Sequence, residues 1–149
     1  MTVVNNSFTP PNPHFERMVR DAFAKRELIM RLGASLAAVT PGRAEIELPF
    51  SAAIVVEQDH FASAAVAAIG ETAGACAALT LMPDGSEAVT VEYKINFIGP
   101  ARGMLLRARG QVVRAGQSIL VARVEVKTLV NGVDSVCAVL QTTMLRVAA

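Results

Sequence analysis

The sequence has little of what several classes of functional site require. Only 5% of its 149 residues are aromatic, and its net charge is +1. A nucleic-acid surface concentrates Lys and Arg and interleaves aromatic side chains, so we expect no nucleic-acid partner. The chain also lacks a GxSxG elbow and a glycine loop of P-loop form. These absences argue against a serine hydrolase of the elbow type and against a P-loop nucleotide site.

Cysteine and histidine are scarce as well. The two cysteines, Cys76 and Cys137, could form one disulfide at most, and together with the two histidines they show no zinc-ligand spacing. We therefore expect a reducing compartment and no metal. Residues 1–15 contain no basic segment followed by an apolar one. No secretory signal is predicted, and the cytoplasm is the expected location.

What the sequence does have is an Ala-rich run, ASAAVAAIGETAGACAALTLM, at residues 62–82. Its part from Ala64 to Met82 approaches the length of a membrane span. However, two glycines and the acid Glu71 lie at its centre, its side chains are mostly Ala, and no Lys or Arg brackets it. The run therefore predicts a buried helix of a globular domain, and we expect no membrane association. The presence of a carboxylate in such a helix then needs a reason.

Local signals place the ends of this helix and suggest how it packs. Ser63 is the predicted N-cap, and the Pro-Asp-Gly segment at residues 83–85 is the predicted stop. Gly70 and Gly74 have a spacing that favours close contact between the helix and a sheet. Residues this small suit a helix that another element wraps closely.

The C-terminal half predicts that element. Four segments are rich in β-branched residues and are separated by the turn sequences GPARG, AGQ and NGVD; they cover residues 88–98, 104–115, 118–130 and 135–147. Polar and apolar residues alternate along 106–109 and again along 121–127. The pattern indicates an antiparallel meander with one packed face and one solvated face.

The N-terminal part predicts a helix and a hairpin. Residues 13–30 carry apolar side chains at helical spacing, and residues 32–39 and 43–48 read as two strands around a turn at Pro41 and Gly42. No linker or repeat divides the chain. We predict one α+β domain over 1–149, with an N-terminal extension and helix in 1–31 and a six-stranded core in 32–146.

A six-stranded sheet around an Ala-rich helix is the hotdog architecture. Three segments resemble the hotdog acyl-CoA thioesterases of the phenylacetate-degradation (PaaI-like) type: ETAGACAALTLMPDG at 71–85, TVEYKINFIGPARG at 90–103, and GQVVRAGQSILVARVEV at 110–126. The resemblance covers roughly residues 32–146. It implies hydrolysis of a medium-chain or aromatic acyl-CoA, with CoA as part of the substrate and no other cofactor. It also implies a homodimer with shared sites, or a dimer of such dimers.

The resemblance assigns roles to particular positions. Glu71 falls where these enzymes carry an acid on the central helix, and Thr90 matches a hydroxyl in the following strand. Their His-Gly-Gly segment at the helix start is replaced here by Ala62-Ser63-Ala64. Val56 stands where members commonly have Asn or Gln, and the nearby Gln58 is a candidate substitute. The lost imidazole is a departure that puts activity in question.

Elementary chemistry supports a site without the imidazole. Thioester hydrolysis needs a base or nucleophile, for which Glu71 is the candidate, and donors for the developing oxyanion. The amides of Ser63 and Ala64 are free donors if the helix starts there. Glu71 lies eight residues beyond Ser63, about 12 Å along a helix. One thioester cannot meet both groups of one chain, so a dimer with two shared sites is expected.

Each assignment has an ordinary structural alternative. Glu71 could be an acid paired with Arg or Lys, Ser63 a simple cap, and Thr90 a simple strand residue. The further candidates for contact with substrate are Gln58, His60, Phe61, Asn96, Arg102 and Arg114. Of these, His60 could be a loop residue, while the two arginines could reach CoA phosphates or belong to a solvated sheet face.

A second function remains open at this point. Loss of His-Gly-Gly is compatible with a non-catalytic hotdog dimer that binds acyl-CoA or a related ligand. A polar cleft with an open Ser63 amide would favour the enzyme. A cleft plugged by His60 and Phe61 would favour the binding protein.

Overall fold

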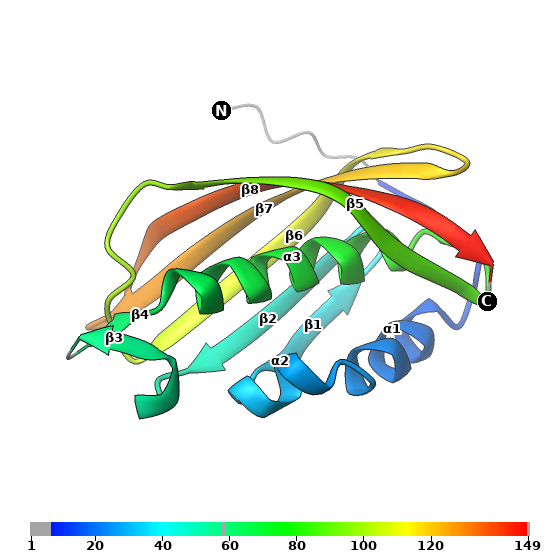
Figure 1. The fold of residues 1–149 in the computed structure, drawn as a ribbon. Coiled ribbons are helices and arrows are strands. Elements are labelled where there is room, and N and C mark those ends of the chain that lie inside the picture. The colour runs from blue at the N-terminus through cyan, green and yellow to red at the C-terminus, as the bar shows by residue number, and fades with distance from the viewer. Residues whose placement is uncertain (1–6, 58, 149) are drawn as a thin grey trace.

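A long helix lies against the concave side of a curved antiparallel sheet in the computed structural model, which describes residues 7–57 and 59–148 (Figure 1). The helix, α3 (Ser63–Leu79), contacts all of the sheet except its first strand closely. The six strands follow the order β1-β2-β6-β7-β8-β5. Their bounds are β1 (Ser35–Thr40), β2 (Arg43–Pro49), β5 (Ser86–Phe97), β6 (Leu105–Ala115), β7 (Ile119–Val130) and β8 (Val133–Ala148).

The predicted hotdog fold is confirmed, and every strand predicted from the sequence is present. Alternation along β6 works as expected, because Leu106 and Ala108 are fully buried under the helix. Arg107, between them, points outward and pairs with Glu47 on β2 at 2.9 Å. The Asn131-Gly132 turn joins β7 and β8 with positive φ at both positions, as this dipeptide predicts.

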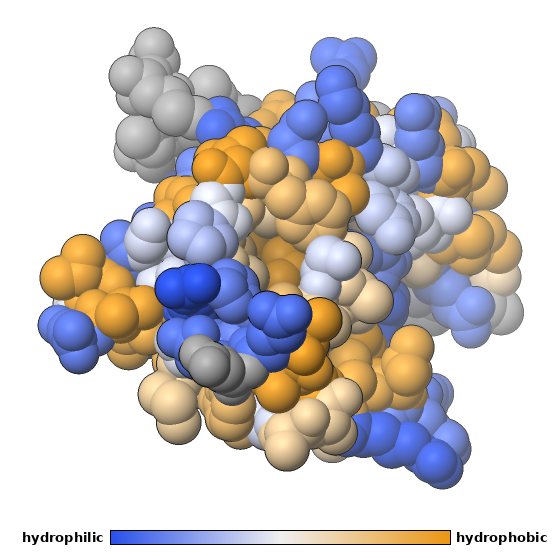
Figure 2. Space-filling view, turned by 60° about the vertical axis from the view of Figure 1, so that its left-hand side comes forward, coloured by the Kyte–Doolittle hydropathy of each residue, from blue (hydrophilic) through white to orange (hydrophobic). Residues whose placement is uncertain are grey.

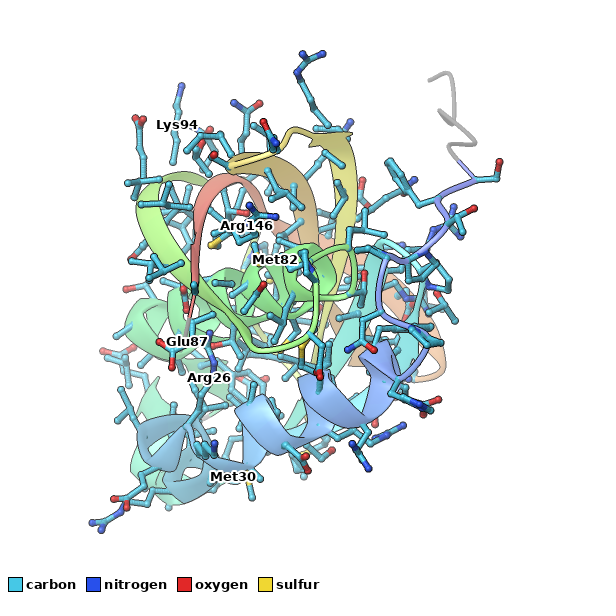
Figure 3. The ribbon with its side chains drawn as sticks, turned by 90° about the vertical axis from the view of Figure 1, so that its right-hand side faces the viewer. Arg26, Met30, Met82, Glu87, Lys94 and Arg146 are labelled. Carbon is cyan, nitrogen blue, oxygen red and sulfur yellow. The ribbon has the colours of Figure 1, made fainter. Side chains whose placement is uncertain are left out.

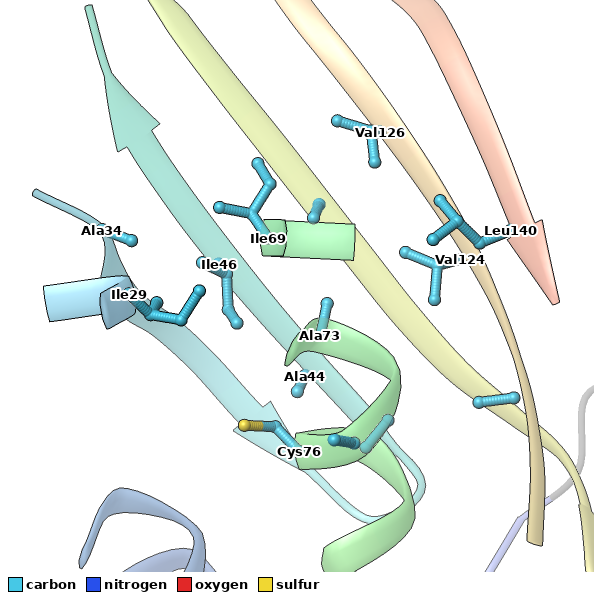
Figure 4. Packing of buried hydrophobic residues seen from close by; sticks show 14 of the residues in the cluster. Ile29, Ala34, Ala44, Ile46, Ile69, Ala73, Cys76, Val124, Val126 and Leu140 are labelled. Atoms are coloured by element: carbon cyan, nitrogen blue, oxygen red, sulfur yellow. The ribbon is translucent and has the colours of Figure 1, made fainter. Parts of the chain in front are cut away.

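Small side chains on α3 permit the predicted close contact with the sheet. A Cβ atom added to Gly70 would lie 2.8 Å from a methyl group of Leu140, and one added to Gly74 would lie 2.5 Å from the Thr142 hydroxyl. Figure 4 shows the buried side chains that fill the space between α3 and the strands. The glycines therefore serve the packing of helix on sheet. Within the described part of the chain, no helix is long and apolar enough to cross a membrane.

The N-terminal helix is not continuous, which corrects the prediction for residues 13–30. It consists of two helices, α1 (Phe15–Ala24) and α2 (Glu27–Leu32). Lys25 and Arg26 donate backbone hydrogen bonds to carbonyls three residues back and so tighten the last turn. Arg26 then leaves helical geometry at φ −84° and ψ 77°. The break lets Phe23 and Ile29 both reach the core, where each is buried.

A short two-stranded sheet precedes the central helix and was not predicted. It consists of β3 (Val55–Glu57) and β4 (His60–Phe61), and a single 3₁₀ turn, η1 (Ala52–Ile54), leads into it. Strands of two and three residues carry too few side chains to show an alternating pattern. This segment fixes the approach of the chain to the start of α3 (Figure 1).

Candidate active site

Glu71 lies on α3 with its carboxylate turned toward β5. Its Oε1 accepts a hydrogen bond from the Thr90 hydroxyl. That hydroxyl also lies 3.3 Å from the Met144 sulfur. It has one proton to donate, and a carboxylate is a much better acceptor than a thioether. The structure therefore brings together the two residues that the sequence proposed for the acid and its hydroxyl partner.

The second carboxylate oxygen of Glu71 meets a cation. Arg26 Nη1 lies 3.5 Å from Oε2, and the Glu71 side chain is only 21% exposed. The alternative that Glu71 is paired with an arginine thus holds alongside the Thr90 contact. Sequence reasoning missed Arg26, which is 45 residues from Glu71 and sits in an unpredicted helix break. No local pattern could have linked the two residues.

The start of α3 offers open donors. The helix begins at Ser63 and its N-cap is Ala62, so the predicted cap is wrong by one residue, and no side chain caps this end. The amides of Ala65 and Val66 donate to the Ala62 carbonyl. The amides of Ser63 and Ala64 precede the first possible intrahelical bond and find no acceptor within the described part of the chain. Both residues are exposed, so a ligand could reach these two N–H groups.

Two of the candidate substrate residues meet beside this helix start. The Arg102 Nε donates a hydrogen bond to His60 Nε2 at 2.8 Å, and Asp59 lies 3.9 Å from both side chains. Figure 2 turns this end of the molecule toward the viewer and shows polar and apolar side chains intermingled on it. A polar cluster of this kind, close to open amides, suits a charged ligand better than a purely apolar one.

Phe61 is placed differently from its neighbour His60. Its ring is 4% exposed and packs edge-on against Phe50, with ring centroids 6.0 Å apart. The ring therefore belongs to the core and does not plug the space outside the helix start.

The remaining candidate residues are scattered. Asn96 is exposed near the end of β5, and Arg114 is exposed near the end of β6. Arg102 precedes the start of β6, so about 30 Å of strand separates the two arginines. They cannot both bind one diphosphate from the same chain. Gln58 lies outside the described residues.

A groove of about 530 Å³ runs between α1 and the first residues of β5. Charged side chains on both walls line it, among them Arg17 and Asp21 on α1, Lys25 at the C-cap of α1, and Glu87 on β5. Arg26 is one of the residues that line this groove, and it also contacts Glu71. Arg26 therefore links the groove to the carboxylate, which is not itself among the groove residues.

The thiols do not contribute a nucleophile. Cys76 and Cys137 are both free and buried. Burial raises the pKa of Cys76 to about 11, against a smaller lowering by Arg26, and burial likewise raises the pKa of Cys137 to about 11. Both thiols are protonated near neutral pH and are therefore inert as nucleophiles. The described residues contain no group of His, Cys, Asp or Glu that could hold a metal ion.

Comparison with known proteins assigns the family. The family model of the thioesterase superfamily matches residues 60–134. A thioesterase family protein of Silicibacter pomeroyi is 28% identical, with a TM-score of 0.88 over 91% of this chain and 99% of that one. A Saccharolobus solfataricus protein provisionally named an esterase is also similar. The two sequences are 27% identical over 112 residues, which cover 74% of this chain and 79% of that protein.

A further likeness concerns the fold. The PaaI protein of the E. coli phenylacetic acid degradation operon is 17% identical, with a TM-score of 0.79 over 93% of this chain and 97% of that one.

Because the family model matches residues 60–134, the chain belongs to the thioesterase superfamily. It is a thioester hydrolase with the hotdog fold, which confirms the resemblance found in the sequence.

Proposed function

We propose that the protein hydrolyses a medium-chain or aromatic acyl-CoA to the free acid and CoA, with Glu71 as general base. The observation that carries this proposal is the Glu71 carboxylate, held by Thr90 on an otherwise apolar helix. One feature supports CoA as part of the substrate. Arg102 and His60 form a polar cluster beside the exposed start of α3, where a phosphate of CoA would find a cation. A CoA substrate also fits a cytoplasmic location.

The reaction follows from these groups. Glu71 takes a proton from water while the water oxygen attacks the thioester carbon. The carbonyl oxygen becomes negative and accepts hydrogen bonds from the amides of Ser63 and Ala64. When the tetrahedral intermediate collapses, the C–S bond breaks, and the CoA sulfur takes the proton from Glu71. Thr90 keeps the carboxylate oriented throughout.

The oxyanion donors must come from a second copy of the chain. Within one chain, Glu71 lies eight residues beyond Ser63, about 12 Å along α3. The strand that carries Thr90, β5, is an edge of the sheet. Apolar side chains are exposed along this strand and at the residue that follows it. They are Val89, Val91, Tyr93, Phe97 and Ile98. Such an edge favours pairing with the same edge of another copy, so a homodimer with two shared sites is the proposed active form.

Two classes of acyl group are proposed for the substrate. The aromatic class is favoured by the likeness of fold to a protein of the phenylacetic acid degradation operon. The medium-chain class comes from the resemblance of the sequence to acyl-CoA thioesterases. Binding of acyl-CoA without turnover is the competing outcome, and the placement of Phe61 in the core argues against it.

The test is thiol release from acyl-CoAs of short to long chain, together with phenylacetyl-CoA and benzoyl-CoA. Glu71→Gln removes the base and keeps the shape of the side chain, so we expect a loss of roughly a hundredfold or more on the preferred substrate. Glu16→Gln is the matched control, because Glu16 is an exposed acid of α1 that pairs with Arg20 and is not among the groove residues. Full activity in a folded Glu71→Gln variant would exclude Glu71 as the base.

A further inference from the structure

The break between α1 and α2 brings a charged residue to the active acid. Arg26 is the N-cap residue of α2 and is the point where the chain leaves helical geometry. Phe23 before it and Ile29 after it are both buried, so the core fixes the direction of the break from both sides. Figure 3 shows Arg26 directed from this break toward the part of the sheet that carries Glu87. A continuous helix would not present the guanidinium in this way.

Arg26 is the main donor to one oxygen of Glu71. Two groups approach Oε2, namely Arg26 Nη1 at 3.5 Å and the Thr72 hydroxyl at 3.3 Å. The Thr72 hydroxyl has one proton, and its shorter contact, at 2.8 Å, is to the Ala68 carbonyl one helical turn back. That contact takes the proton. The cation is therefore left to hold Oε2, while Thr90 holds Oε1.

The carboxylate needs such a partner. Apart from Thr72, the residues within one turn of Glu71 on α3 are Ala, Gly and Ile, and the Glu71 side chain is only 21% exposed. A carboxylate that has lost most of its water keeps a defined position only if donors replace that water. Thr90 replaces water at Oε1, and Arg26 replaces it at Oε2. A carboxylate has about four acceptor directions, so a direction on Oε1 remains open for the attacking water.

We propose that Arg26 is a positioning residue for Glu71, supplied by the helix pair that lies outside the part of the chain matched by the family model. This inference rests on the proposed function of Glu71 as base. The distance of 3.5 Å between Arg26 Nη1 and Glu71 Oε2 is long for a charge-assisted hydrogen bond. The contact therefore depends on the charge of the guanidinium and not on a pair of parallel hydrogen bonds. A lysine at this position keeps that charge and preserves the effect in part.

The experiment compares Arg26→Gln and Arg26→Lys with the wild type on the preferred acyl-CoA. For Arg26→Gln we expect kcat to fall about fivefold to tenfold, with little change in KM or melting temperature. Arg26→Lys is expected to recover most of kcat. Arg31→Gln is the matched control, because it removes the same guanidinium charge from an exposed residue of α2 that pairs with Glu27 and is not among the groove residues, so it leaves kcat unchanged.

A double variant separates positioning from general damage. If Arg26 acts through Glu71, adding Arg26→Gln to Glu71→Gln leaves the residual activity unchanged, whereas independent effects multiply. Wild-type kcat in Arg26→Gln, with Glu71→Gln inactive, would overturn the role of Arg26 and leave the proposed function standing. No turnover by the wild type, or equal turnover by Glu71→Gln, would overturn both.

Discussion

Thr90 and Arg26 hold the Glu71 carboxylate from two different elements. Thr90 belongs to β5 and meets Oε1, while Arg26 belongs to the helix break and meets Oε2. Glu71 itself comes from α3. The orientation of the acid therefore depends on three segments that are distant in the sequence. Each contact can be removed separately, which makes its share in catalysis measurable.

Thr90→Val is expected to lower kcat about tenfold or more on the preferred acyl-CoA. Valine keeps the β-branched shape that suits a strand and loses the hydroxyl that donates to Glu71. Thr90→Ser retains the hydroxyl and should stay within a few-fold of the wild type. Steady-state kinetics of the three proteins provides the measurement. Equal kcat in the valine and serine variants would show that the hydrogen bond has no catalytic role.

The sequence predicted the Glu71 and Thr90 pair but not Arg26, and the reason lies in the kind of signal. Glu71 is anomalous within its own helix, and Thr90 follows it in a segment with a recognisable pattern. Arg26 is one of several basic residues in an amphipathic stretch. Neither Lys25 nor Arg26 is a helix breaker. The break results from burial of Phe23 and Ile29, which is a tertiary effect.

In the proposed mechanism, the first turn of α3 contributes to catalysis through its main-chain N–H groups. Ser63→Pro removes one of them in a position that accepts proline, since Ser63 is the first helical residue. Ala62 before it already has φ −58° and ψ 135°, which a following proline favours. We therefore expect a folded protein that has lost about tenfold to a hundredfold in kcat.

Ser63→Ala is the control for this change. It removes the hydroxyl and keeps the amide, so its kcat should equal that of the wild type. Kinetics and circular dichroism on both variants provide the test. A strong loss in Ser63→Ala would assign the role to the side chain instead of the main chain.

The packing of α3 on the sheet predicts that an alanine is tolerated at Gly70 but not at Gly110. A Cβ on Gly110 would overlap the main-chain carbonyl of Ala73, which cannot move aside. A Cβ on Gly70 would meet the flexible methyl groups of Leu140. Gly110→Ala should lower the free energy of unfolding by about 2–3 kcal/mol, and Gly70→Ala by less than about 1 kcal/mol, because the gain in helix propensity offsets the contact. Chemical denaturation measures both, and the reverse ranking would contradict the packing.

The sequence predicted secondary structure correctly where the alternation of polar and apolar side chains extended over enough residues. The last strand was predicted at 135–147 and lies at Val133–Ala148. The two short strands before α3 escaped notice because residues 55–57 and 60–61 are too few to alternate. Ser63 was misjudged as the cap because a Ser before an apolar run is the usual signal, whereas Ala62 adopts that position.

The molecule as a whole exposes one long apolar edge. Val91→Lys on β5 should convert dimers to monomers, since a charge on an edge strand opposes edge-to-edge pairing. Val91 is 56% exposed. Val113→Lys is the control, because Val113 is 41% exposed on an interior strand. Light scattering with size-exclusion chromatography gives the mass of each. A dimeric Val91→Lys variant would exclude this edge as the interface.

Assembly could be foreseen only in part from the sequence. The eight-residue spacing between Ser63 and Glu71 predicts a site shared with a second copy, but the proposed interface depends on strand order. The sheet order places β5 at an edge. The order of the strands along the chain does not predict this, because β5 lies between other strands in the sequence. Thr90 lies on that same strand. The proposed site therefore includes a residue of the edge strand, and we predict that activity depends on the oligomeric state.

Subunit mixing tests the shared site most directly. Glu71→Gln and Ser63→Pro subunits, each nearly inactive alone, are combined by co-expression with two different tags. A mixed dimer contains one doubly defective site and one intact site, so random assortment should restore about a quarter of the wild-type activity. Purified mixed dimers should show about half. No recovery in dimers proven to contain both chains would contradict a site built from Glu71 of one copy and the helix start of the other.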